Sequence, residues 1–144
     1  MRMNRSLILV GGLLVAATGV VASAAAARQP DEQAGAVRRG EVLYQVHCQT
    51  CHGKRAAGDG PLAEHLRVAP ADLRRLSHRL GGYSEAWLVR VIDGREEVGA
   101  HGSREMPVWG IGFREPGRPG DQEADVRARI QDLVEYLVSI QQAP

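Results

Sequence analysis

The stretch VHCQTCHGK, residues 46–54, contains both cysteines of the chain and constrains it more than any other feature. Cys48 and Cys51 are three residues apart, and His52 follows directly. Residues at i and i+3 lie on the same side of a helical turn, so both sulfurs can meet one partner. Three kinds of site use such a pair: a redox disulfide, part of a zinc site, or a covalent attachment site.

C-x-x-C-H is the spacing of c-type haem attachment, in which the two sulfurs meet the two vinyl groups of one porphyrin and the histidine meets the iron. A thioredoxin-like pair needs a βαβ context, and no strand pattern competes in this sequence. A structural zinc site takes four ligands, so Cys48, Cys51 and His52 would need a distant fourth. A disulfide across three residues would close a very small loop and stabilise little. The motif therefore predicts one haem c, attached through Cys48 and Cys51.

The first 27 residues are expected to be a targeting segment. Two arginines precede an uncharged stretch, residues 6–27, whose end is rich in alanine, as in a secretory signal with an A-x-A cleavage site. The alternative is a retained anchor, because 22 uncharged residues are long enough to span a bilayer. Either interpretation predicts an exported, periplasmic protein that touches the membrane only if this segment is retained. Residues 28–35 are expected to form a flexible lead-in, and residues 36–144 one domain.

Charge and composition indicate which kinds of molecule the domain can bind. From residue 28 onward there are 16 Lys or Arg and 17 Asp or Glu, a net charge of −1, without a basic stripe interleaved with aromatic side chains. That pattern argues against nucleic-acid binding. Aromatic residues make up 4% of the chain, so the domain must fill its centre with something else, and a bound macrocycle would do so.

Helical periodicity is visible at both ends of this domain. A helix is expected over residues 36–48, where Val37, Gly40, Tyr44 and Cys48 share a face. Gly40 is a poor helix former, and a small residue on a buried face indicates another backbone crossing closely. The last helix carries an apolar stripe that steps by 4, 3, 4 and 3. The stripe consists of Val126, Ile130, Leu133, Leu137 and Ile140.

Weaker signals lie between these two helices. Ser84 and Gly94 are expected to cap a helix between them, and Asp121 or Asp125 to cap the last one. Residues 96–120 follow neither period and are expected to form a long functional or disordered loop. The predicted fold class is all-α, with several helices and long connecting loops.

A second iron ligand is expected from Met106, the single methionine outside the targeting segment. Pro107 restricts Met106 to extended geometry, which suits projection of the side chain at a fixed target, and a Met/His pair raises the reduction potential. The alternative is that Met106 fills the core. The competing ligands are His47, His65, His78 and His101. His101 is the rival. His47 is too close to the attachment turn to reach the far side of the ring and is interpreted as a bystander on the helix, and His65 and His78 are expected to be surface histidines.

These residues together resemble a class I (monohaem) c-type cytochrome over nearly all of the exported part. GEVLYQVHCQTCHG matches the N-terminal helix of that family, RIQDLVEYL the C-terminal helix, GDGP the segment after the attachment site and MPVWG the Met-ligand loop. The resemblance implies the cytochrome c fold over residues 36–144, in which the two terminal helices cross around the covalently bound haem. It also implies that the Pro61 carbonyl accepts a hydrogen bond from the His52 ring, and that Trp109 packs beside the haem.

The function implied by the resemblance is the transport of single electrons by a haem iron ligated by His52 and Met106. Its partners would be redox proteins that dock transiently, and the chain would be a monomer or a complex subunit rather than an enzyme. A first alternative is a fixed relay subunit of a membrane or periplasmic oxidoreductase complex. A less favoured one is a haem sensor or a peroxidase with a labile sixth ligand.

Overall fold

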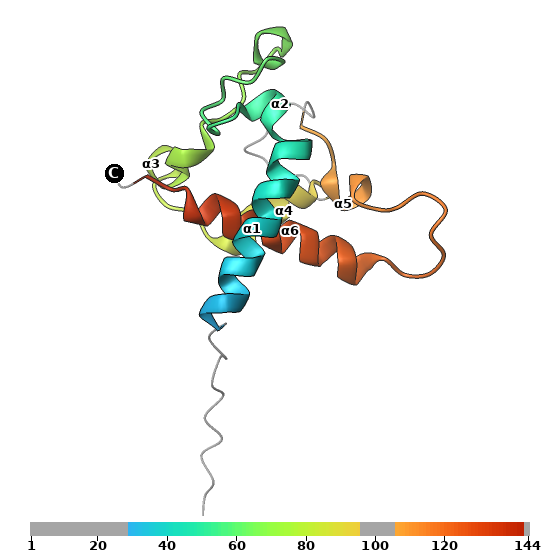
Figure 1. Cartoon of the computed structure of the whole chain (residues 1–144). Coiled ribbons are helices and arrows are strands. Elements are labelled where there is room, and N and C mark those ends of the chain that lie inside the picture. The colour runs from blue at the N-terminus through green and yellow to red at the C-terminus, as the bar shows by residue number, and fades with distance from the viewer. Residues whose placement is uncertain (1–28, 96–105, 143–144) are drawn as a thin grey trace, which may run out of the picture.

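The computed structural model describes residues 29–95 and 106–142, in which the elements are helices and no strand occurs (Figure 1). The α-helices are α1 (Pro30–His47), α2 (Gln49–His52), α3 (Leu76–Leu80), α4 (Glu85–Asp93), α5 (Trp109–Gly112) and α6 (Glu123–Ser139), and two 3₁₀ turns are η1 (Ala63–His65) and η2 (Leu73–Arg75). The predicted all-α class is confirmed. The expected targeting segment and His101 lie outside the described residues. Among the described helices, none is long and apolar enough to cross a membrane.

The first helix begins earlier than the sequence pattern predicts. It starts at Pro30 instead of residue 36, so the expected flexible lead-in is helical from Pro30 onward. Proline suits the first helical position because its missing N–H would have no partner there. Asp31 and Glu32 follow in the first turn, where carboxylates interact favourably with the helix dipole. The polar residues of this stretch predicted a flexible segment, but they form the first part of α1, which is mostly exposed to solvent.

α1 and α6 cross closely at Gly40, as its position in the middle of the helix predicts (Figure 1). A Cβ on Gly40 would collide with the Asp132 carbonyl oxygen and would lie 2.8 Å from the Tyr136 Cβ. Next to this contact the Tyr44 and Tyr136 rings pack at 5.3 Å. Arg39 closes the exposed side with two hydrogen bonds to the Asp132 carboxylate, of 2.8 and 2.9 Å. The absence of a side chain at Gly40 is therefore what lets these two helices touch.

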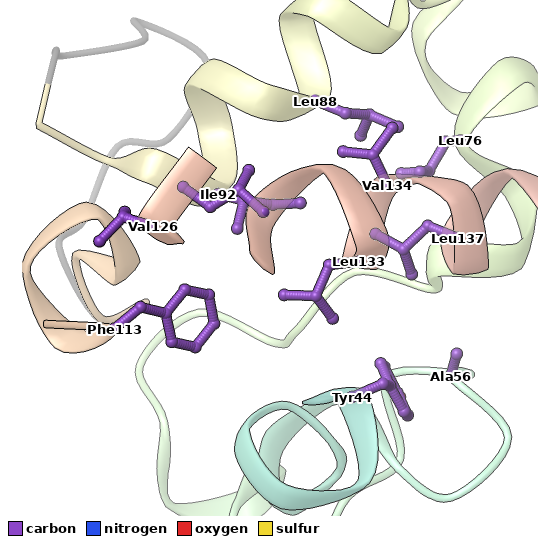
Figure 2. Packing of buried hydrophobic residues seen from close by; sticks show 11 residues of the cluster. Tyr44, Ala56, Leu76, Leu88, Ile92, Phe113, Val126, Leu133, Val134 and Leu137 are labelled. Atoms are coloured by element: carbon purple, nitrogen blue, oxygen red, sulfur yellow. The ribbon is translucent and has the colours of Figure 1, made fainter. Parts of the chain in front are cut away.

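The apolar stripe of α6 forms the centre of the core. Four of its five residues are buried, and the fifth, Ile140, is partly buried at the end of the helix. Figure 2 shows α4 covering one side of α6 with Leu88 and Ile92, while Tyr44 approaches from α1. The buried cluster consists of Tyr44, Ala56, Leu76, Leu88, Ile92, Phe113, Val126, Ile130, Leu133, Val134 and Leu137.

The helix caps agree with the sequence at α4 and differ at α6. The Ser84 hydroxyl accepts a hydrogen bond from the Trp87 N–H at 3.1 Å, and Gly94 ends α4 in the left-handed conformation. α6 instead starts after Gln122, whose side chain is turned to the preceding loop and accepts from the Glu115 N–H at 2.7 Å. Of the two predicted caps, Asp121 accepts from the Glu123 N–H at 2.9 Å from just outside the helix, and Asp125 lies within it.

Candidate functional site

The C-x-x-C-H motif forms a compact turn at the end of α1. Cys48 ends α1 and precedes the single turn α2, which contains Cys51 and His52. The His52 N–H donates to the Cys48 carbonyl at 2.9 Å, and the Cys48 N–H to the Tyr44 carbonyl at 2.8 Å. Both thiols are free and partly buried. The structure therefore brings Cys48, Cys51 and His52 together on one helical turn, as the spacing predicts.

The glycine-rich loop over residues 53–62 folds back over this turn through backbone hydrogen bonds. These bonds join Gly58 N–H to His52 O at 2.8 Å, Gly60 N–H to Cys51 O at 3.1 Å and Leu62 N–H to Thr50 O at 3.0 Å. The approach requires glycine at position 60, because a Cβ there would lie 2.6 Å from the Cys51 carbonyl carbon and would collide with the Thr50 oxygen. The loop therefore caps the carbonyl groups that a short helix leaves without partners.

The His52 ring is oriented by Ala71 in this structure. Its Nδ1 lies 3.1 Å from the Ala71 carbonyl oxygen. The acceptor in this structure therefore comes from Ala71, and the role that the resemblance implies for the Pro61 carbonyl stays a prediction. A carbonyl can only accept, so Nδ1 carries the proton and Nε2 keeps its lone pair. Burial lowers the pKa of His52, opposed by this hydrogen bond, and the ring is the neutral form that binds metals.

The Ala71 carbonyl is itself held in place by the residues that follow it. Asp72 caps η2 by accepting from the Arg74 N–H at 3.0 Å, and the Arg74 guanidinium donates to both Asp72 carboxylate oxygens at 2.9 and 2.8 Å. The Leu73 N–H donates to the Ala56 carbonyl at 2.8 Å, which ties this segment to the glycine-rich loop. The residues behind His52 thus fix the direction of its Nε2, as outer partners of a metal-binding histidine do.

The side chains of this turn fit a covalently bound haem. Burial, and to a smaller extent the neighbouring Cys51, raise the pKa of the Cys48 thiol to about 12. Its sulfur is therefore a neutral thiol in a partly buried place. The Tyr44 hydroxyl donates to the Gly53 carbonyl at 2.6 Å and anchors the turn to the core. Two thiols on one turn and a neutral imidazole with a free Nε2 are the donor set that a c-type haem uses.

The segment that contains Met106 also packs against the core. Met106 is partly buried and packs against the buried cluster, as does Trp109, the first residue of α5. Trp109 stacks on Phe113 with ring centroids 5.2 Å apart, and it also contacts the His47 ring at 5.2 Å. Trp109 thus lies beside the residue that precedes Cys48. Whether Met106 ligates iron, or fills the core, stays a prediction.

Sequence reasoning missed two contributors to this site. His47 is interpreted as a bystander, yet it contacts two aromatic rings; its place at i+7 from Gly40 and i+3 from Tyr44, on the packed face of α1, was the available signal. Ala71 acts through its backbone, so its side chain gave no signal. Of the predicted surface histidines, His65 and His78 are exposed as expected.

One comparison with known proteins found a relationship. The family model described as "Cytochrome C oxidase, cbb3-type, subunit III" matches residues 35–115, more than half of the chain. No curated relative and no solved structure matches the chain. The match spans the attachment turn, the glycine-rich loop, Ala71 and the Met106 segment. It confirms the resemblance to a monohaem c-type cytochrome and agrees with the helical fold.

Proposed function

Because the chain belongs to the family of cbb3-type cytochrome C oxidase subunit III, we propose that it transfers single electrons through one haem c held by the Cys48–His52 turn. The observation that carries the proposal is the contact of His52 Nδ1 with the Ala71 carbonyl at 3.1 Å. That contact leaves Nε2 available beside two free thiols. When bound, the haem supplies a one-electron Fe(III)/Fe(II) couple.

Each residue of the site has a separate task in this proposal. Cys48 and Cys51 would hold the porphyrin through thioether bonds, and His52 would supply one iron ligand through its ring nitrogen. Met106 would supply a sulfur ligand, and Trp109 would pack next to it. Such a Met/His pair would raise the reduction potential of the iron. The chain's contribution is thus to fix the ligands in advance and to exclude water around them, which keeps the cost of reorganisation small.

A second candidate is a fixed relay within an oxidase complex. The family is named for a subunit of a cytochrome C oxidase, which favours this role over that of a free carrier. In both roles the chain works outside the cytoplasm, with residues 1–27 as signal or anchor. Purification of the tagged full chain from its native membranes separates the roles: stable co-purification with a catalytic subunit supports the relay, and recovery of the chain alone supports the carrier.

Attachment is tested by the mass and visible spectrum of the full chain made in a host that attaches haem c. We expect the mass of one haem to survive denaturation, and Cys48→Ala with Cys51→Ala to abolish that mass. His65→Ala, which replaces an exposed histidine, is the control and should keep the haem. Noncovalent or absent haem in the unaltered chain would overturn the proposal.

The sixth ligand is tested with Met106→Ala and His101→Ala in the oxidised holoprotein. We expect the weak sulfur-to-iron absorption band near the red edge of the visible spectrum to be lost in Met106→Ala and retained in His101→Ala. The reduced Met106→Ala protein should then bind CO, whereas the unaltered protein should not at neutral pH. CO binding by the unaltered protein would instead support the sensor or peroxidase alternative.

A further inference from the structure

Three aromatic side chains, which we call the His47 cluster, join α1 to α5. The His47 ring packs edge-on against Trp109 and against Phe113, each at 5.2 Å between ring centroids. Trp109 and Phe113 stack on one another at 5.2 Å and 25°. His47 is the last residue of α1 and directly precedes Cys48, while the other two rings belong to α5 and the residue that ends it. The cluster therefore connects the two segments that the proposed site brings together.

We propose that His47 is a positioning residue, which holds the Met106 segment against the helix that carries Cys48. The inference rests on the proposed ligation of iron by Met106. Pro107 and Val108 separate Met106 from Trp109, and proline limits the backbone freedom of that link. A Trp109 ring that cannot move therefore restricts the positions open to the Met106 sulfur.

The two sides of α5 are held by different helices. On one side, a Cβ on Gly94 would lie 3.3 Å from the Val108 Cα, and one on Gly110 would lie 2.6 Å from Asp93 Oδ1, so the end of α4 packs tightly on this segment. On the other side, the His47 ring at the end of α1 contacts Trp109 and Phe113. Arg129 of α6 also donates to the Phe113 carbonyl at 3.3 Å. Loss of the His47 ring would therefore leave α5 held by α4 and α6, and would remove the aromatic contacts that join it to the end of α1 beside the attachment turn.

The surroundings of His47 suit an aromatic contact better than a charge. Phe113 is 3% exposed and forms a rigid base for the stack. Burial lowers the pKa of His47, and Arg129 lowers it further, so the ring is neutral at neutral pH. A neutral imidazole packs edge-to-face on aromatic rings as other aromatic side chains do. Phenylalanine should therefore replace histidine at this position without loss.

The test measures how easily an external base displaces the Met106 sulfur in the oxidised full-length holoprotein. Imidazole is the probe, and loss of the sulfur-to-iron band reports its binding. Removal of edge-to-face contacts in His47→Leu should raise the apparent imidazole affinity roughly three- to tenfold. His47→Phe should return it to about the unaltered value. If leucine prevents folding, His47→Gln replaces it.

Tyr136→Leu is the matched control. It removes the α6 ring that packs on Tyr44 of α1, with ring centroids 5.3 Å apart, at the crossing of these two helices. It should lower the unfolding temperature while the imidazole affinity stays within about twofold of the unaltered protein. An equal rise in His47→Leu and Tyr136→Leu would show general loosening and overturn the inference. Unchanged affinity in His47→Leu would overturn it as well and leave the proposed ligation intact. A protein without the sulfur band would overturn Met106 ligation itself, and the inference with it.

Discussion

The crossing of α1 with α6 and the attachment turn with its loop are built by different interactions. At the crossing, residues far apart in sequence meet through side chains: the Tyr44 and Tyr136 rings pack together, and Arg39 binds Asp132. At the turn, residues 49–62 are held by backbone hydrogen bonds from one stretch of chain to the next. Side chains thus determine how the two long helices pack, whereas backbone geometry determines the direction in which His52 points.

The two regions should therefore respond differently to substitution. The crossing has no room for a side chain at Gly40, so damage there should affect the whole domain. The glycine-rich loop covers a single turn, so damage there should affect the site more than the fold. Both regions meet at the hydrogen bond from Tyr44 to the Gly53 carbonyl.

The largest effect is expected from Gly40→Ala. The new Cβ would lie 2.6 Å from the Asp132 carbonyl carbon, and because backbone cannot rotate aside, the helices must separate. We expect a loss of about 3 kcal/mol or more in the free energy of unfolding, measured by denaturant titration. Gly35→Ala on the same helix is the control: its Cβ meets the flexible end of Arg39 at 3.3 Å, and alanine should stabilise the helix by about 0.5–1 kcal/mol. Equal effects of the two substitutions would contradict the close crossing.

A smaller and more local effect is expected from Gly60→Ala. Its Cβ would push the loop off the Cys51 carbonyl and should lower the free energy of unfolding by about 1–3 kcal/mol. The visible spectrum of the haem should change more than the far-ultraviolet circular dichroism, which reports helix content. Pro61→Ala is the neighbouring control and should leave the spectrum unchanged, because it keeps the backbone carbonyl at position 61 and does not alter the Ala71 carbonyl that the His52 ring contacts. An equally changed spectrum in Pro61→Ala would contradict the specific role of the close approach at Gly60.

The sequence predicted the crossing of α1 and α6 better than the path of the glycine-rich loop. The reason is that side chains build the crossing, whereas backbone hydrogen bonds build the loop. Gly40 and the stripe of α6 are side-chain patterns with helical periods, so both helices and their close approach could be predicted from them. The acceptor for His52 is a backbone carbonyl, which every residue has, so the choice between Pro61 and Ala71 depended on the path of the loop. The start of α1 was misjudged because exposed helical turns are as polar as a loop.

The link between the two regions is tested by Tyr44→Phe. The substitution removes the hydrogen bond of 2.6 Å from the Tyr44 hydroxyl to the Gly53 carbonyl, while the ring stays packed on Tyr136. The Gly53 oxygen keeps the Ala56 N–H as a donor at 3.1 Å, so we expect a loss of about 1 kcal/mol in denaturant titration. Tyr136→Phe, which retains the same ring pair, should cost less. A larger loss in Tyr136→Phe than in Tyr44→Phe would mean that the crossing does not depend on this anchor.

The smallest effect concerns the residues behind Ala71 and is recognised by its disappearance in acid. Hydrogen bonds from the Arg74 side chain are the main cause that lowers the pKa of Asp72 to about 2 from an ordinary 3.8. A carboxylate with a lowered pKa stabilises the fold above its unfolded-state pKa, and this contribution is lost as the pH falls through the folded-state value. The unfolding temperature of Asp72→Asn should therefore lie slightly below that of the unaltered protein at pH 5, and the gap should close between about pH 4 and pH 2. Glu64→Gln, at a side chain that is 80% exposed, is the charge-matched control. A gap that persists unchanged to pH 2 would show that the Arg74 contact does not hold the segment that orients His52.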